Sequence, residues 1–297
     1  PPTPFSPTPF HAMATEPTAT RRILLVDDDR GLRFALSAML KDAGHHVEVA
    51  GDGPEALALL ESGRFDIVLL DIGLPSMNGL DVLKRARALD APPVVVVMTA
   101  DDTSETLLEA ARRQAYRYLR KPFAPNVIVE VVQDAAASAS AAALSIEVVS
   151  ARPEWLELIA PCALEMADRI RSFVMHLEAD LPEPVRESVA QAFRELLTNA
   201  IEWGGKLDPE RKVRISFVRA KRMLLYRIAD PGEGFDIDRL RHAAISNPAD
   251  DPIRHLTVRE EKGLRPGGFG LAMTQSLVDE LIYNEARNEV MFIKYLD

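Results

Sequence analysis

Acidic side chains, one threonine and one lysine follow apolar runs in the first half of the chain. Residues 27–29 are all aspartate and come directly after such a run, and Asp71, Thr99 and Lys121 each follow a later one. Carboxylates brought together repel one another, and a hard divalent ion such as Mg²⁺ relieves that repulsion. A lysine opposite could hold an incoming phosphoryl group, and a hydroxyl could hydrogen-bond to it. The pattern predicts a phosphoryl-acceptor site.

The apolar runs predict the elements that bring these side chains together. Between residues 22 and 140, five short apolar runs alternate with helical patterns; the runs are 23–26, 47–50, 67–70, 94–98 and 116–119. Strands that are each followed by a helix imply a doubly wound, five-stranded parallel sheet covered on both faces. Such a sheet places its chemistry at the carboxyl ends of its strands. The acidic residues and Lys121 should therefore meet at one edge.

A second group of polar and glycine residues occurs in the other half of the chain. Glu195 and Asn199 lie four residues apart, so they share a helix face and could orient a nucleophile and bind Mg²⁺. Asp230 begins the segment DPGEGF, where glycines let the backbone approach a flat ligand such as adenine. Residues 267–271, GGFGL, open a helix whose free N–H groups favour phosphate. No GxxxxGK[ST] segment occurs, so the pattern predicts a nucleotide pocket without a P-loop.

The order of elements changes near residue 141, after a stretch of alanine and serine. Strands are expected at 145–150, 155–159, 212–219, 223–229 and 289–296, with helices at 162–180, 184–203 and 270–281. These elements predict an α/β sandwich of one sheet and one helical layer. The predicted division is a disordered tail at 1–21, a first domain at 22–140, a linker at 141–144 and a second domain at 145–297.

Composition narrows the class of protein. The chain has 297 residues and a formal net charge of -10, which argues against direct binding to a nucleic-acid backbone. Cys162 is the single cysteine, so no intrachain disulfide can form, and a reducing cytoplasm is the expected compartment. No apolar run approaches the roughly 20 residues that cross a bilayer, and the Pro- and Thr-rich start does not look like a signal peptide. We expect no membrane partner.

The segments ILLVDDD, LLDIGLPSMNGLDVL, VVVMTA and YLRKPF, in that order and spacing, resemble response-regulator receiver domains over residues 22–140. The resemblance implies a flavodoxin-like fold in which Asp71 is the phosphoacceptor. It also implies that Asp28 and Asp71 bind Mg²⁺ together with the carbonyl of Gly73, and that Asp27 supports the metal.

The same resemblance assigns the remaining residues of the first site. It implies that Thr99 and Tyr118 form the switch pair, that Lys121 faces the phosphate, and that Thr99 and Lys121 assist the transfer to Asp71. It further implies a cis peptide bond between Lys121 and Pro122, which is plausible because X-Pro bonds adopt that form at low cost.

The segments RELLTNAIEWG, DPGEGFD and GGFGLAMTQSLVDELIYNEARNEVMFIKYL resemble the N, G1 and G2 boxes of GHKL ATPases, and most closely the anti-sigma-factor serine kinases, over residues 144–297. The resemblance implies that Asn199 is a Mg²⁺ ligand, that Glu195 is the general base or positions a water molecule, and that Asp230 binds adenine. It adds to the ATP pocket Gly232, Gly234, Phe235, Gly268, Gly270 and Leu271.

Between the two glycine segments, residues 246–266 would form an ATP lid, in which Lys262 and Arg265 are candidates for phosphate contacts. The sequence departs from the family pattern at two positions. Trp203 stands where the family often has histidine, and Phe269 stands where it often has a basic residue.

These observations predict a two-component response regulator that is phosphorylated on Asp71 by an upstream histidine kinase or a small phosphodonor. Its ATP-binding output domain would phosphorylate a serine or threonine of a protein antagonist, or sequester a sigma factor. One alternative is a nucleotide-gated interaction module without catalysis, and another is an atypical histidine kinase acting in trans. No H-box helix precedes the domain, and His176 is expected to be a core or surface residue. Receiver domains also often dimerise, so a homodimer is compatible with the sequence.

Overall fold

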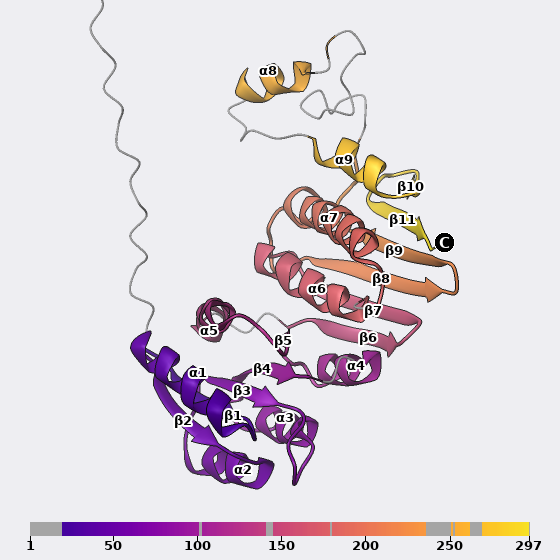
Figure 1. Cartoon of the computed structure of the whole chain (residues 1–297). Coiled ribbons are helices and arrows are strands. Elements are labelled where there is room, and N and C mark those ends of the chain that lie inside the picture. Colours follow the sequence, from indigo (N-terminus) through magenta and orange to yellow (C-terminus); the bar gives the residue numbers. More distant parts are fainter. Residues whose placement is uncertain are drawn as a thin grey trace, which may run out of the picture.

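The computed structural model describes residues 20–100, 103–140, 145–178, 180–235, 251, 253–261 and 269–296. These residues form two sheets, each with its own covering helices, stacked one above the other along the chain (Figure 1). The first sheet belongs to the N-terminal half and the second to the C-terminal half. Each agrees with the fold class that the order of apolar segments predicts.

The first sheet is parallel throughout, in the strand order β2-β1-β3-β4-β5. Its strands are β1 (Arg22–Val26), β2 (His46–Ala50), β3 (Ile67–Asp71), β4 (Val94–Thr99) and β5 (Arg117–Arg120). Every residue of β3 is buried, as expected of a central strand covered on both faces. The strands therefore end at a common edge, where the residues that follow them meet.

Five helices cover this sheet: α1 (Arg30–Asp42), α2 (Gly53–Ser62), α3 (Gly79–Arg87), α4 (Ser104–Arg112) and α5 (Pro125–Ser140). Alternate side chains of β1 belong to two apolar clusters: Leu24 packs with residues of α2, α3 and α4, whereas Ile23 packs with α1 and α5. Side-chain caps define where the first helices begin, with Asp29 capping α1 and Asp52 capping α2.

The second sheet is antiparallel, in the strand order β10-β11-β9-β8-β7-β6. Its strands are β6 (Glu147–Arg152), β7 (Trp155–Pro161), β8 (Lys212–Ala220), β9 (Met223–Ala229), β10 (Glu280–Tyr283) and β11 (Glu289–Tyr295). The helical segments are α6 (Leu164–Leu177), α7 (Glu183–Asn199), the π-helical turn η1 (Ala200–Gly204), α8 (Arg254–Glu261) and α9 (Gly270–Leu277). Figure 1 shows α6 and α7 lying along one face of this sheet.

Alternation of side chains explains why one face of the second sheet carries the core. Phe217 of β8, Tyr226 of β9 and Phe292 of β11 are fully buried and stack across three neighbouring strands, with ring centroids 4.9 and 4.7 Å apart. Phe193 of α7 packs on the same Tyr226 ring from the helical layer. The helical layer is thus held to the sheet by a row of aromatic side chains that runs across the strands.

Two local predictions are wrong. The helix predicted at 270–281 ends at Leu277, because Val278 is extended and the next residues pair with β11 as the short strand β10. The helix predicted to run to Trp203 is α-helical only as far as Asn199 and continues as η1. The predicted linker at 141–144 and almost all of the predicted tail at 1–21 lie outside the described residues.

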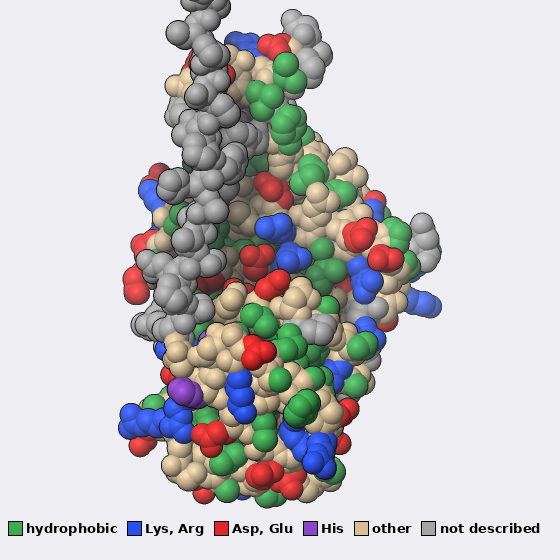
Figure 2. Space-filling model, turned by 60° about the vertical axis from the view of Figure 1, so that its left-hand side comes forward, with side chains coloured by type: hydrophobic (Ala, Val, Ile, Leu, Met, Phe, Trp, Pro, Cys, Tyr) green, Lys and Arg blue, Asp and Glu red, His purple; other side chains and the backbone are tan. Residues whose placement is uncertain are grey.

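The two halves touch through defined elements. Helix α4 packs against β6 and α6, and β5 also contacts α6, so one continuous apolar cluster includes residues of both sheets. Figure 1 shows α4 directly beside β6. On the face drawn in Figure 2, acidic and basic side chains are interspersed over the described surface of both halves.

Candidate functional site

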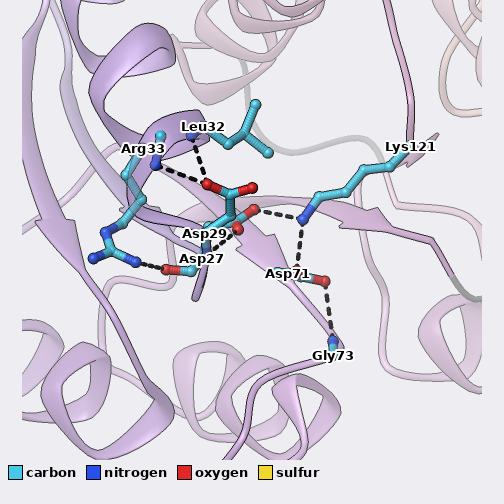
Figure 3. A network of polar contacts seen from close by, with 8 residues as sticks. Asp27, Asp29, Leu32, Arg33, Asp71, Gly73 and Lys121 are labelled. Carbon is cyan, nitrogen blue, oxygen red and sulfur yellow. Dashed lines mark hydrogen bonds and ion pairs between the residues drawn. The ribbon is translucent and has the colours of Figure 1, made fainter.

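Three strand ends bring the predicted acidic residues and the lysine together (Figure 3). The Lys121 Nζ donates to Asp27 Oδ2 and to Asp71 Oδ2, each at 2.6 Å. Asp71 is the last residue of β3, Asp27 follows β1, and Lys121 follows β5. Both carboxylates are almost completely buried, so the ammonium group neutralises charges that water does not reach.

The protonation of this group follows from its contacts. Burial raises the pKa of Asp27, although hydrogen bonds from Lys121 and the Asp29 N–H act in the opposite direction. Burial alone would lower the pKa of Lys121, but its hydrogen bonds to Asp27 and Asp71 outweigh burial and raise that pKa. Lys121 therefore stays cationic in this site at neutral pH.

The same edge offers a set of oxygen ligands for a divalent ion. One carboxylate oxygen each of Asp27, Asp28 and Asp71 lie within 4.8 Å of one another, and Asp28 is exposed while the other two are buried. Three carboxylates on one side suit a hard cation that keeps part of its water shell. Asp29 is instead occupied as the cap of α1, accepting from Gly31 N and Leu32 N.

Glycines shape the loop after β3. The Gly73 N–H donates to Asp71 Oδ1 at 3.0 Å, which fixes the orientation of that carboxylate. A Cβ atom on Gly79 would lie 2.2 Å from the backbone oxygen of Asp71, so only glycine permits this close approach. The metal-binding role of the Gly73 carbonyl stays a prediction.

Of the two predicted switch residues, Thr99 lies at the end of its strand and Tyr118 lies within its strand. Thr99 is the last residue of β4 and is buried, and Tyr118 of β5 is also buried. The Tyr118 ring meets the ring of His176 of α6 edge-on, with centroids 5.3 Å apart. The predicted cis bond between Lys121 and Pro122 is confirmed.

In the second half of the chain, α7 places Glu195 and Asn199 on one face. The Asn199 Nδ2 donates to Glu195 Oε1 at 3.2 Å. The first residue of α9 lies directly on this pair, because a Cβ atom on Gly270 would be 1.7 Å from Glu195 Oε1. A carboxylate and a carboxamide therefore meet a helix N-terminus, an arrangement suited to holding phosphate and its metal ion.

Asp230 lies at the end of β9, against the π-helical turn. It accepts a hydrogen bond from Gly232 N at 2.7 Å, and burial raises its pKa. A Cβ atom on Gly204 would lie 2.1 Å from Asp230 Oδ1. Gly204 was not among the predicted site residues, although the pair Gly204-Gly205 at the end of a long helical pattern marks this position in the sequence. The π-helical turn allows this contact, and such turns frequently occur at functional sites.

The glycine segment after Asp230 is held by the loop between β10 and β11. Gly234 has a φ of +84°, and a Cβ atom there would meet the Ala286 carbonyl oxygen at 1.6 Å. Asn288 Nδ2 donates to Gly232 O at 2.9 Å, a contact that the sequence analysis missed. Phe235 lies edge-on to the Tyr283 ring.

The structure describes only some of the remaining residues predicted for the nucleotide pocket. Leu271 of α9 is partly buried against the main apolar cluster. Gly268, Lys262 and Arg265 lie outside the described residues, as does most of the predicted lid at 246–266; its described part includes α8. Trp203 and Phe269, where the chain departs from the family pattern, are exposed.

Comparison with known families identifies both halves of the chain. Residues 23–133 match the response regulator receiver domain, and residues 160–294 match the histidine kinase-like ATPase domain. The chain joins a receiver domain to a histidine kinase-like ATPase domain. The acidic edge belongs to the receiver domain, and the Glu195–Asn199 pair belongs to the ATPase domain.

Curated relatives match the receiver part. The DNA-binding response regulator MtrA of Mycobacterium tuberculosis is 40% identical over 116 residues, which cover 39% of this chain and 50% of MtrA. The response regulator MprA of Mycolicibacterium vanbaalenii is 42% identical over 103 residues, covering 35% of this chain and 45% of MprA. The chain thus spans about half the length of these relatives, and their DNA binding is a property of those proteins.

Solved structures resemble the same part. The receiver domain protein of Methanospirillum hungatei is 29% identical, with a TM-score of 0.40, and the match covers 41% of this chain and 98% of that one. The chemotaxis response regulator CheY4 of Vibrio cholerae is 32% identical, with a TM-score of 0.37, and the match covers 39% and 99%. Within the described residues, no helix combines the length and apolar character needed to span a membrane.

Proposed function

We propose that the chain is a response regulator whose receiver domain, phosphorylated on Asp71, controls the ATPase domain to which it is joined. A histidine kinase or a small phosphodonor would supply the phosphoryl group. Two observations support this: the Asp71 carboxylate accepts a hydrogen bond from Lys121, and Thr99 is the last residue of the neighbouring strand β4.

The contact between Tyr118 and His176 is the observation that carries this proposal. Tyr118 belongs to the receiver domain and His176 to the ATPase domain, and their rings touch edge-on at 5.3 Å. A second contact lies beside it: Arg169 of α6 donates to the backbone oxygen of Tyr116 at 3.2 Å and lies over the Tyr116 ring. The residue that we predict to be part of the receiver switch therefore contacts the ATPase domain directly.

Phosphorylation would change the charges that hold this arrangement. A phosphoryl group on Asp71 adds negative charge next to Lys121 and acceptor oxygens within reach of the β4 end. The Thr99 hydroxyl would donate a hydrogen bond to that group, so the Thr99 side chain would move towards Asp71. Tyr118, on the neighbouring strand, would then move into the space that Thr99 leaves. Because Tyr118 packs on His176, its movement would repack α6 and so reach the nucleotide pocket.

For the output, we propose a serine/threonine protein kinase, or an anti-sigma-type regulator that binds its partner when nucleotide is bound. Asp230 would accept a hydrogen bond from the adenine amino group, and Asn199 would be a ligand of Mg²⁺. The metal would neutralise charge on the transferring phosphoryl group. Glu195 would accept the proton of the attacking hydroxyl while the oxygen–phosphorus bond forms and ADP leaves.

The test measures ATP turnover by the full chain with Mg²⁺, with and without acetyl phosphate as the phosphodonor. Wild type should show a change in turnover on treatment, and Asp71→Ala should show none. If wild type and Asp71→Ala respond identically to acetyl phosphate, receiver control is excluded.

A non-catalytic nucleotide-gated module is the second candidate, and the two departures from the family pattern favour it. Trp203 and Phe269 are exposed. They stand where the family often has a histidine and a basic residue, whose polar side chains could contact the nucleotide. A Glu195→Ala variant separates the candidates, because it should abolish turnover in a kinase but leave nucleotide-dependent partner binding intact in a module.

The histidine kinase alternative would need a histidine that accepts the phosphoryl group. The position of His176 disfavours this role, since its Nδ1 contacts the Ser172 carbonyl oxygen at 2.5 Å and its ring packs on Tyr118.

A further inference from the structure

The turn between β10 and β11, residues 284–288, lies against the glycine segment that follows Asp230. The backbone oxygen of Asn288 accepts from Asp230 N at 2.9 Å. A Cβ atom on Gly234 would collide with the backbone of the same turn. Both ends of the segment 230–234 therefore abut this one turn.

Two asparagine side chains in the turn have orientations that backbone groups determine. Asn284 Oδ1 accepts from Asn288 N at 3.1 Å and from Glu289 N at 3.2 Å, so Nδ2 is the Asn284 atom left to donate. It donates to Asn288 Oδ1 at 2.8 Å, and Asn288 in turn presents its own Nδ2 to Gly232 O at 2.9 Å. Because an N–H group can only donate, neither amide can be flipped without losing these bonds.

The same chain of hydrogen bonds continues to the carboxylate of Asp230. Gly232 accepts from Asn288 with its carbonyl oxygen and donates its N–H to Asp230 Oδ1 at 2.7 Å. Within the described residues, Asp230 Oδ2 accepts no hydrogen bond. The turn thus helps to fix one oxygen of this carboxylate and leaves the other for a ligand.

We propose that Asn288, oriented by Asn284, is a positioning residue that determines how strongly the nucleotide pocket selects adenine. It acts through Gly232, whose N–H aims the Asp230 carboxylate at the exocyclic amino group of the base. A carboxylate held in place discriminates better than one that can turn away when the amino group is missing. This inference rests on the proposed role of Asp230 in the nucleotide pocket and adds the residues that would set its selectivity.

Isothermal titration of the full chain with Mg²⁺ tests the proposal. The two probes are ADP and purine riboside diphosphate, which differs from ADP only in lacking the exocyclic amino group. Wild type should bind ADP about tenfold more tightly, since a hydrogen bond to a charged group separates the two probes. The ratio of the two affinities is the readout, because a variant with a merely loosened fold would bind both nucleotides equally less well.

Variants of the two asparagines should change this ratio. Asn288→Asp keeps the shape of the side chain but turns an acceptor towards the Gly232 carbonyl, so the ratio should fall by about fivefold. Asn288→Ala removes the donor without adding repulsion and should lower the ratio less. Asn284→Ala should lower it too, because the Asn288 amide would lose its orienting partner.

Asn126→Asp, the same chemical change at an exposed position of α5, is the matched control and should keep the wild-type ratio. Circular dichroism verifies that each variant is folded, and Asn288→Ala provides the test if Asn288→Asp does not fold.

Folded Asn288 variants that keep the wild-type ratio, or that weaken both nucleotides equally, would overturn the proposal. A wild-type ratio in Asn284→Ala would also contradict it, since Asn288 would then need no orienting partner. Failure of the proposed adenine contact has a separate signature. Wild type and Asp230→Asn would then show the same ratio, and this proposal would fall together with that contact.

Discussion

Glu178 is completely buried at the C-terminal end of α6, and neither of its carboxylate oxygens has a hydrogen-bond partner within the described part of the chain. Burial raises its pKa to about 8, and Asp180 adds to this, while Arg219 and Arg186 act in the opposite direction. Arg219 is paired with Asp180 at 2.6 Å, and its charge does not offset the effect of burial on the pKa of Glu178. At neutral pH, the protonated form of Glu178 predominates in the folded chain.

This residue predicts a pH dependence of stability. The folded pKa lies above the ordinary value of 4.5, so the folded state binds the proton more tightly than the unfolded state. The associated stability is complete below about pH 4.5 and is lost as the pH rises towards about 8. Glu178→Gln, which stays neutral, should be more stable than wild type by roughly a few kcal/mol at pH 8.5, and by much less at pH 5.5.

Urea unfolding of both proteins at the two pH values, followed by tryptophan fluorescence, measures the difference. Glu187→Gln, at an exposed position of α7, is the control and should follow the wild-type profile. Parallel profiles for Glu178→Gln and wild type would show that Glu178 does not titrate in this window.

Gly270 determines where the Glu195 carboxylate can lie. A methyl group at this position would overlap the end of the Glu195 side chain, which is flexible and can rotate away. Gly270→Ala should therefore leave the fold intact while moving Glu195 off Asn199. We expect ATP turnover to fall by about tenfold or more, with a smaller change in ADP affinity.

Steady-state turnover and ADP titration of Gly270→Ala measure these two effects. Gly51→Ala makes the same chemical change in the receiver domain, where the added atom meets nothing closer than 3.4 Å, and it should leave turnover unchanged. Unaltered turnover in Gly270→Ala would mean that the position of Glu195 does not limit the reaction.

At the scale of elements, periodicity located most strands and helices because one face of each is buried. It failed at β10, where Leu271, Thr274 and Leu281 continue a helical spacing although residues from Glu280 onward are extended. The pairing of β10 with β11, such as Leu281 opposite Phe292, is a non-local contact that helical spacing along the chain does not reveal. Here the tertiary partner outweighs the local pattern.

Contacts in the candidate site that follow from the sheet topology could be predicted, whereas contacts that depend on tertiary packing could not. Lys121, Asp27 and Asp71 could be grouped because parallel strands end at one edge, a rule that needs no distances. The contact of Gly204 with Asp230 depends on a π-helical turn, which adds a residue to the helical circuit and has no distinct sequence period. The pairing of Tyr118 with His176 depends on how two domains dock, and neither residue type signals it.

The π-helical turn itself makes a prediction. It brings Gly204 so close to Asp230 that a side chain at Gly204 would collide with the carboxylate and its Cβ atom. Gly204→Ala should therefore displace Asp230 and weaken ADP binding by about tenfold or more, comparable to Asp230→Asn. Fluorescence titration with ADP compares the two variants with wild type. Gly204→Ala with wild-type affinity would show that Asp230 is not held by this turn.

At the scale of the whole molecule, the apolar cluster shared by α4, β5, β6 and α6 makes the two domains one packed unit. Covalent linkage alone would not couple them, because coupling requires contacts that differ in energy between two states. Under the proposed function Tyr118 would provide such a contact, since it belongs to the switch pair predicted for the receiver and its ring meets the ring of His176 in the ATPase domain.

His176→Ala should therefore separate phosphorylation from output. Acetyl phosphate should still phosphorylate Asp71 in this variant, and ATP should still be turned over, but the change in turnover on phosphorylation should shrink. Measured allosteric couplings correspond to about 5- to 150-fold effects, so a loss of this size is within reach of a turnover assay. His46→Ala, an exposed histidine of the receiver domain, is the matched control. If His176→Ala keeps the full response, the signal crosses the interface elsewhere. The contact of Arg169 with Tyr116 would then be changed next, because Arg169 of α6 donates to the Tyr116 backbone oxygen and lies over the Tyr116 ring.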